Sequence, residues 1–154
     1  MLVEPEIPPN TGAIARTCVA TGSPLHLVGD LGFSIDEHAV RRAGLDYWHL
    51  LELHRHADLA AFCASHPQSR LHLLSANATR SYLDADFEPG DALVFGRESV
   101  GLPAAILDAH PARVWAIPTI GETVRSLNLS NAVGIVLYEA LRRTGALARP
   151  SVAT

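Results

Sequence analysis

The chain of 154 residues contains no lysine, so all 12 of its basic residues are arginines. Sixteen acidic residues outnumber them and give a formal net charge of −4, which excludes a general electrostatic attraction to nucleic acid. Two explanations of the missing lysines stay open: genomic base composition, and use of the planar guanidinium for phosphate and base contacts. Any nucleic-acid contact would need a local basic patch. Candidates for such a patch are Arg41 with Arg42, Arg55 with His54 and His56, and Arg80.

Cysteine and long hydrophobic runs are also scarce. Cys18 and Cys63 match no metal-ligand spacing and lie in apolar helical patterns, so we interpret both as buried free thiols. The eight histidines form no ligand set, and His54 with His56 is expected at the surface, so no metal is predicted. No apolar run is long enough to cross a membrane, and the N-terminus lacks a secretory pattern. These absences favour a cytoplasmic protein without a membrane partner.

Short apolar runs alternate with helical patterns along the whole chain, which predicts an α/β fold: a parallel sheet with helices on both faces. We expect a single domain over residues 1–145 and a flexible tail over 146–154. Asn10 is predicted to cap the first helix and Gly22 to end it. The predicted strands are 1–3, 25–28, 47–51, 71–74, 93–95 and 114–117, and the predicted helices are 11–21, 34–44, 58–64, 103–107 and 129–143.

The stretch from Arg125 to Arg143 joins a polar turn directly to a strongly apolar helix. Apolar residues recur there at the spacing of a buried helical face, and Ile135 with Tyr138 widens that face, so the helix is expected to pack on two sides. The apolar content of the whole chain, 48%, indicates either a buried oligomer face or a well-filled monomer core. Free backbone N–H groups at the start of a helix can bind a ligand, and the polar turn is therefore a candidate binding site.

Three polar loops follow predicted strands, at the edge where ligands bind in parallel sheets. They read EPEIPPNTGAIAR (4–16), FGRESVGLP (95–103) and IPTIGETVRSLNLSN (117–131). The glycine motifs of dinucleotide-binding and P-loop proteins are absent, as is the G-x-S-x-G turn of hydrolases. The loops thus predict a pocket for a small ligand, with arginine, glutamate, asparagine and serine side chains available for a polar partner.

At these loops the sequence resembles the SPOUT superfamily of RNA methyltransferases, and within it the tRNA (cytidine/uridine 2′-O) methyltransferases that modify the wobble nucleotide. EPEIPPNTGAIARTC, RRAGLDYW (41–48), FGRESVGLP and RSLNLSNAVGIVLYEA occur in order, and RRAGLDYW is typical of the wobble-position branch. The resemblance implies a deep trefoil knot at the C-terminal end and a homodimer with its pocket near the interface. It also implies S-adenosylmethionine as methyl donor, S-adenosylhomocysteine as product, no metal, and a tRNA anticodon stem-loop as substrate.

The resemblance also implies roles for individual residues. The matching catalytic positions are Arg16, Asn10, Glu98 and Asn128. The matching donor-binding positions are Leu74, Gly96, Ile117, Ser126 and Leu127. Arg41, Arg42 and Trp48 are candidates for RNA contact. A guanidinium with a pKa above about 12 is a poor base, so Arg16 is expected to clamp a phosphate or the developing alkoxide. The alternatives are an ion pair of Arg16 with Glu4 or Glu6, a core position for Trp48, and a helix-capping role for the two arginines.

Some positions depart from the pattern of the family. The first strand, Met1 to Val3, is short, which is expected to weaken an edge of the sheet. Residues 75–78 stand where relatives carry threonines and a lysine, and Arg97 with Val100 replaces a common proline and arginine. Two other functions therefore stay open: 2′-O-methylation of another tRNA or rRNA nucleotide, and a donor-binding RNA-binding module with impaired catalysis.

Overall fold

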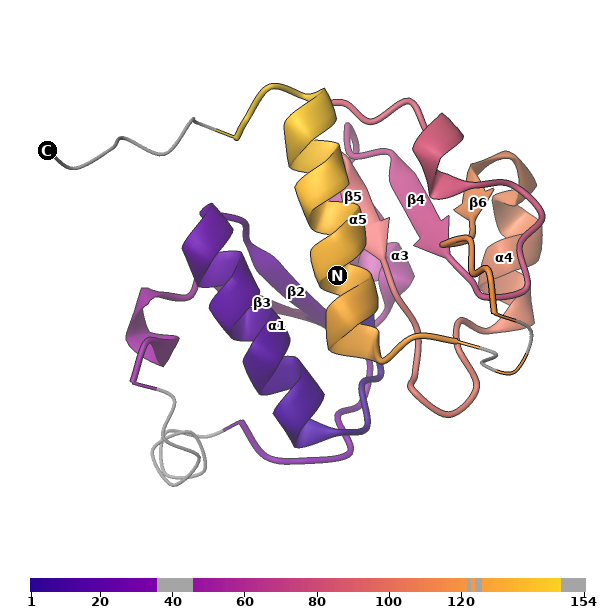
Figure 1. Ribbon diagram of the computed structural model, residues 1–154. Helices are drawn as coiled ribbons and strands as arrows, with labels where there is room; N and C mark the ends of the chain where they lie inside the picture. Colours follow the sequence, from indigo (N-terminus) through magenta and orange to yellow (C-terminus); the bar gives the residue numbers. More distant parts are fainter. Residues whose placement is uncertain (36–45, 122, 124–125, 148–154) are drawn as a thin grey trace, which may run out of the picture.

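The computed structural model describes residues 1–35, 46–121, 123 and 126–147, and confirms the alternation of strands and helices (Figure 1). The strands are β1 (Leu2–Val3), β2 (Leu25–Val28), β3 (Leu53–His56), β4 (Leu71–Leu74), β5 (Ala92–Val94) and β6 (Val114–Trp115). The α-helices are α1 (Pro8–Thr21), α3 (Leu59–Ser65), α4 (Ala104–Ala109) and α5 (Leu129–Arg143), and the 3₁₀ turns are η1 (Trp48–Leu50), η2 (Tyr82–Asp84) and η3 (Pro111–Arg113). No helix among these residues has the length and apolar character that crossing a membrane requires.

The strands pair in parallel as two groups, β1-β2-β3 and β5-β4-β6. A parallel bridge between Leu2 and Phe95 joins the groups, and the Val3 N–H donates to the Phe95 carbonyl over 2.8 Å. The expectation that the short first strand forms a weak edge is therefore wrong. Strand β1 lies inside the array, between β2 and the residue that follows β5, where neighbours on both sides satisfy its backbone.

Helices cover both faces of this array, as predicted. On one face α1 and α5 lie side by side (Figure 1), and Ile14 and Val136 from these helices pack with Leu2 and Leu27. On the other face Phe62 of α3 packs with Val3 and Val28, the strand residues next to Leu2 and Leu27. Because successive strand residues point to opposite faces, the short apolar runs supply both halves of the core. The core consequently holds the carboxyl ends of the strands at one edge.

Two local predictions are wrong. The strand predicted over residues 47–51 is wrong, because the turn η1 (Trp48–Leu50) lies there and the strand follows as β3. Strand β3 is the last strand of its group and is less covered than a central strand. Its sequence, LHRH, can therefore be polar and lacks the apolar run by which a central strand is predicted. Asn10 does not cap α1 either: the helix begins at Pro8, with Ile7 at the cap position, so Asn10 lies inside its first turn. The predicted helix over 34–44 lies largely outside the described residues.

Thr11 offers a simple test of packing on the inner face of α1. Its side chain is 1% exposed, and its hydroxyl has no hydrogen-bond partner among the described residues. A buried hydroxyl without a partner destabilises the fold, whereas a methyl group of the same size does not. We expect Thr11→Val to raise the free energy of unfolding by about 1 kcal/mol in urea denaturation. Thr17→Val serves as the control, because the exposed Thr17 hydroxyl already donates to the Ala13 carbonyl. A loss of stability in Thr11→Val would show that its hydroxyl has a partner.

Four histidines gather on the α3 face of β2 and β3. His26 stacks on His54 with ring centroids 4.7 Å apart, and His66 meets His26 edge-on at 5.1 Å. The His26 Nδ1 atom lies 2.9 Å from His56 Nε2. His54 and His56 are expected at the surface and are only partly covered, but the sequence gives no sign of this cluster. Among the described residues no group of three or more histidines, cysteines or carboxylates is arranged to hold a metal ion.

The histidine cluster makes stability depend on pH. Burial, followed by nearby positive charges that include the other histidines, lowers the pKa of His26 to about 4. Between the ordinary histidine pKa and this value the unfolded chain binds a proton that the folded chain does not. We expect the free energy of unfolding to fall by about 1–2 kcal/mol as pH drops from about 6.5 to about 4. This energy is smaller than the full pKa shift would give, because solvent screens the partly exposed His26 ring. His26→Phe should flatten this part of the curve, and an equally steep curve would contradict the assignment.

Candidate functional site

A cavity of about 680 Å³ opens at the carboxyl ends of β4, β5 and β6. Its walls come from the loops that follow these strands and from the turn before α5. All five residues predicted to bind the donor line it: Leu74, Gly96, Ile117, Ser126 and Leu127. Three of the four predicted catalytic residues line it as well: Asn10, Glu98 and Asn128. The structure thus brings eight predicted positions together from four separate parts of the sequence.

Gly96 lies in the cavity wall, where the backbone leaves no room for a side chain. A Cβ atom placed on Gly96 would lie 2.1 Å from the Gly101 carbonyl carbon and 2.2 Å from the Leu102 nitrogen. The loop between these residues closes on itself, since Arg97 and Gly101 exchange two backbone hydrogen bonds. Only glycine permits this approach of backbone to backbone. The loop therefore turns back sharply after β5 and presents its backbone to the cavity.

Asn10, Glu98 and Asn128 form a continuous hydrogen-bonded network. The Asn128 Nδ2 group donates to Asn10 Oδ1 over 2.9 Å, and the Asn10 Nδ2 group donates to Glu98 Oε1 over 3.1 Å. The Asn10 side chain is well placed for this role, because the residue is only 8% exposed. The network ties α1, the loop after β5 and the turn before α5 to one another.

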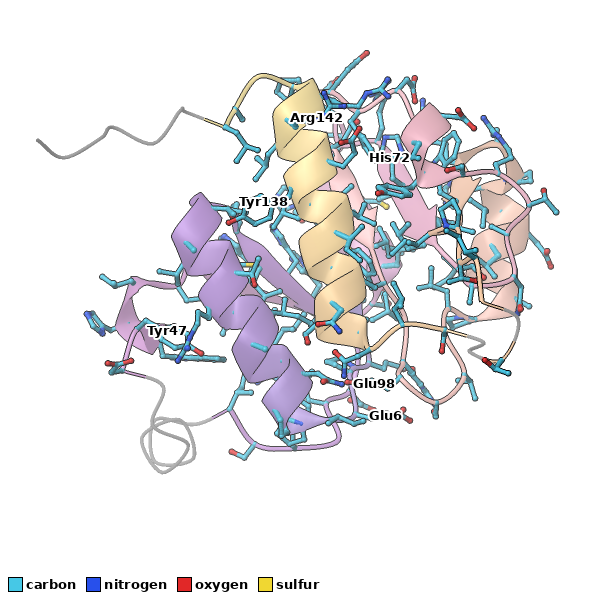
Figure 2. The ribbon with its side chains drawn as sticks, viewed as in Figure 1. Glu6, Tyr47, His72, Glu98, Tyr138 and Arg142 are labelled. Carbon is cyan, nitrogen blue, oxygen red and sulfur yellow. The ribbon has the colours of Figure 1, made fainter. Side chains whose placement is uncertain are left out.

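The Glu98 carboxylate also closes the start of α1. It accepts hydrogen bonds from the backbone N–H groups of Glu6 at 2.8 Å and Ile7 at 3.2 Å. In return the Glu6 carboxylate accepts from the Ser99 backbone N–H at 3.0 Å and hydroxyl at 2.9 Å, and these bonds lower the pKa of Glu6. Figure 2 shows Glu6 and Glu98 close to each other, below the lower end of α5 and to the right of the lower end of α1. The Glu98 carboxylate thus accepts three hydrogen bonds, two from backbone N–H groups and one from the Asn10 side chain. These bonds are consistent with a residue that holds the loops in place.

Asn128 performs a second task as the cap of α5. Its Oδ1 atom accepts from the Ser130 backbone N–H at 2.9 Å and from the Ser130 hydroxyl at 2.6 Å. A side-chain oxygen at this position satisfies backbone donors that the helix itself leaves unpaired. The polar turn of the sequence is therefore fixed to the helix by Asn128, and to α1 by the amide group of the same residue.

Arg16 is the predicted catalytic residue that the structure leaves outside the cavity. It is exposed on α1, and its guanidinium lies 4.9 Å from the centre of the Tyr47 ring. Tyr47 is fixed in turn, because its hydroxyl donates to the Gly12 carbonyl over 2.8 Å. The alternative of an ion pair with Glu4 or Glu6 is wrong, since these carboxylates bind Arg97 and Ser99. Arg16 therefore faces outward from its own chain, next to Tyr47.

The predicted RNA contacts are only partly described. Trp48 is half-buried and packs against the core cluster, so its position is compatible with both RNA contact and the alternative interpretation. Arg41 and Arg42 lie outside the described residues. Sequence reasoning missed Glu6, because nothing near it in the chain indicates that its partner lies 93 residues away.

The parallel α/β sheet and the loops around this cavity agree with an RNA methyltransferase of the SPOUT type, and comparison with known proteins shows the family. The chain belongs to the SpoU rRNA methylase family, whose model matches residues 1–138. It is 47% identical over 146 residues to the tRNA (cytidine(34)-2′-O)-methyltransferase of Escherichia coli (strain K12), covering 94% of this chain and 92% of that protein. A similar relative from Acidovorax sp. (strain JS42) is 46% identical over 154 residues, covering 98% of this chain and 94% of that protein.

Solved structures give the same result. One, described as structural insights into the 2-OH methylation of C/U34 on tRNA, is 46% identical with a TM-score of 0.82, covering 92% of each chain. An AdoMet-bound rRNA methyltransferase from Sinorhizobium meliloti is 27% identical with a TM-score of 0.75, covering 92% of this chain and 54% of that one. AdoMet is S-adenosylmethionine, so a structure of this fold with the expected donor bound is among the relatives.

Proposed function

We propose that this chain transfers a methyl group from S-adenosylmethionine to the ribose 2′-hydroxyl of nucleotide 34, the wobble nucleotide, in tRNA. The observation that carries the proposal is the near full-length similarity to methyltransferases named for that nucleotide. The gathering of eight predicted site residues at one cavity agrees with it. A tRNA substrate also favours the cytoplasm as the place of action.

The cavity fits the methyl donor in size and chemistry. Its volume lies within the range of small-ligand sites. Leu74, Ile117 and Leu127 offer apolar surface to an adenine ring, while Ser126 and the backbone around Gly96 offer polar groups to the ribose and amino-acid portions. The close approach at Gly96 keeps the wall free of side-chain atoms. We propose these five residues as the donor site, within the trefoil knot that the family resemblance predicts.

We further propose a homodimer that completes the active site. Arg16 does not line the cavity of its own chain, so we propose that a second copy supplies it to the site. The surface next to α1 suits such a contact, because Ile135 and Tyr138 of α5 are large apolar residues exposed by 39% and 48%. Figure 2 shows Tyr138 on the upper part of α5, facing α1. Pairing through this surface would cover the apolar residues and place each Arg16 near the other chain.

In the proposed reaction the ribose 2′-oxygen forms a bond to the methyl carbon as the carbon–sulfur bond breaks. When bound, S-adenosylmethionine supplies the methyl group on a sulfonium, which is already activated. The remaining difficulty is the weak nucleophile, and Arg16 would stabilise the developing alkoxide or hold the adjacent phosphate. Glu98, Asn10 and Asn128 would keep the loops in attack geometry. The hydroxyl proton would pass to a substrate phosphate or to water.

The substrate would be read from an unstacked anticodon loop, because the grooves of A-form RNA hide base identity. Trp48, Arg41 and Arg42 are the proposed contacts. If the arginines bind phosphates, tRNA affinity should fall less steeply with salt in Arg41→Ala than in the unmodified protein. Identical slopes would remove Arg41 from the contact.

The proposed function is tested with labelled S-adenosylmethionine and total tRNA from a strain that lacks the enzyme. We expect label at the ribose of nucleotide 34 in a subset of tRNAs, located by nuclease digestion and mass spectrometry. Label at another nucleotide would contradict the assigned position while keeping the chemistry. Tight donor binding without transfer would instead identify an RNA-binding module that has lost catalysis.

A further inference from the structure

His72 is a fully buried histidine whose ring nitrogens both have partners. It lies on β4, where Figure 2 labels it. The Trp115 indole N–H donates to His72 Nδ1 over 3.1 Å, and His72 Nε2 lies 2.8 Å from Asp91 Oδ2. An indole N–H can only donate, so Nδ1 carries no hydrogen and the ring is the neutral form with its hydrogen on Nε2. His72 therefore accepts from Trp115 and donates to Asp91.

Asp91 is a fixed anchor for this ring. Its carboxylate accepts hydrogen bonds from Arg70 Nε at 2.8 Å and Nη2 at 2.7 Å, and from the Glu88 backbone N–H at 2.8 Å. The Asp91 side chain is 7% exposed. Arg113 is the other cation near this ring. Its Nη1 atom lies 3.5 Å from His72 Nε2, farther than the Asp91 carboxylate oxygen at 2.8 Å, so Asp91 is the partner of Nε2. The order Arg70, Asp91, His72, Trp115 thus runs from the surface inward.

Trp115 connects this network to the cavity that it lines. Its backbone is held independently of His72, because it pairs with Leu74 and its carbonyl accepts from the Ser75 N–H over 2.9 Å. Its ring packs in the same apolar cluster as the cavity residues Leu74 and Ile117, with the Arg80 guanidinium 4.1 Å from the ring centre. The backbone contacts leave the indole free to rotate, and the bond to His72 limits that rotation together with the packing of the ring and the Arg80 contact.

We propose that His72 is a positioning residue for the methyl donor: by accepting the Trp115 indole N–H, it fixes the orientation of a ring in the cavity wall. The inference rests on the proposed assignment of this cavity to the donor. The inference adds one requirement for donor binding that the loop motifs do not indicate. The side chain of residue 72 must present an uncharged hydrogen-bond acceptor to the Trp115 indole N–H. Because the donor contacts the wall before and during the reaction, the effect is expected on donor binding and not on the chemical step.

Two substitutions separate this role from simple packing. In His72→Asn the amide oxygen stands where Nδ1 stood, so the Trp115 N–H keeps its acceptor while the bond to Asp91 is lost. In His72→Gln the amide reaches toward Asp91, and the Trp115 N–H is left without a partner. Each variant loses one of the two hydrogen bonds of His72 and has a smaller side chain. The Tm of thermal unfolding should therefore fall to a similar extent in both variants. Only the glutamine variant is expected to disturb the cavity wall.

The measurements are KM for S-adenosylmethionine, kcat, and calorimetric titration with S-adenosylhomocysteine. We expect His72→Gln to raise the donor KM and the product Kd about tenfold with kcat nearly unchanged, and His72→Asn to stay within about twofold of the unmodified protein. Trp115→Phe, which removes the N–H without touching His72, should raise the donor KM to a similar extent. His72→Gln in that background should add nothing.

Three outcomes would overturn the inference: unchanged donor KM in a folded His72→Gln protein, an equal rise in both histidine variants, or additive effects of His72→Gln and Trp115→Phe. If His72→Gln does not fold, Trp115→Phe decides alone, because an unchanged donor KM in that variant contradicts the inference. A different result, absence of S-adenosylhomocysteine binding to the unmodified protein, would overturn the proposed function itself and with it the basis of the inference.

Discussion

Gly96→Ala is expected to abolish donor binding, with a Kd for S-adenosylhomocysteine raised more than about 100-fold, or to prevent folding altogether. The new methyl group would stand 2.1 Å from the Gly101 carbonyl carbon, and the atoms it meets belong to the backbone, so no side chain can move aside. The turn after β5 would have to open, and that turn carries the cavity wall and Glu98. Calorimetric titration with S-adenosylhomocysteine, together with circular dichroism, measures both consequences.

Gly32→Ala is the matched control for this substitution. The same methyl group at residue 32 would meet its nearest atom, Glu6 Cα, at 3.8 Å, an ordinary van der Waals contact. Donor affinity should therefore stay unchanged and stability should change by less than about 1 kcal/mol. Normal donor affinity in Gly96→Ala would show that the loop after β5 does not form this part of the site.

Arg16→Ala is expected to lower kcat by about 100- to 1000-fold while the affinity for S-adenosylhomocysteine stays the same. The reason is that Arg16 lies outside the cavity proposed for the donor and would act on the RNA ribose or its phosphate. Arg16→Lys should recover only a small part of the loss, because the planar guanidinium has a fixed fork of donors that an ammonium lacks. Single-turnover methyl transfer at saturating donor separates these effects, and full activity in Arg16→Ala would remove the role.

A mixing experiment tests whether Arg16 acts across the proposed dimer. Arg16→Ala and Asn128→Ala are each expected to be nearly inactive alone. In a dimer with one copy of each, the chain that keeps Asn128 would receive its Arg16 from the other copy, so one intact site is formed. Random mixing of equal amounts should therefore restore about a quarter of the unmodified activity. If Arg16 acted within its own chain, mixing would restore nothing.

Much of the fold follows from the sequence because the strands at the centre of a parallel sheet are short apolar runs. Leu71–Leu74 is an example, buried at all four positions and predicted with its bounds unchanged. Strand β3 could not be predicted in the same way, because an edge strand with the sequence LHRH resembles a polar surface segment. The residues of the cavity were predicted through the family resemblance, since the loops by themselves are ordinary turns.

The roles of individual side chains depended on contacts that local patterns cannot indicate. Asn10 resembles a helix cap in the sequence, yet its amide bonds to partners 88 and 118 residues away. Likewise, the spacing of the histidines predicts no site, whereas the sheet places His26 beside His56 and buries His72 against Trp115. Arg16 is the reverse case. The family motif indicates its role, but the fold of a single chain does not place it in the cavity wall. Such pairings arise from the packing of the whole chain.

In the proposed reaction the cavity holds a methyl donor against the ribose of nucleotide 34. This reaction is tested most directly with two synthetic anticodon stem-loops that differ only in the sugar of that nucleotide, one ribose and one 2′-deoxyribose. We predict transfer of one methyl group per molecule to the first and none to the second, with equal binding of S-adenosylhomocysteine in both mixtures. Methylation of the 2′-deoxy substrate, or failure to methylate the ribose substrate at saturating donor, would show that the 2′-hydroxyl of nucleotide 34 is not the acceptor.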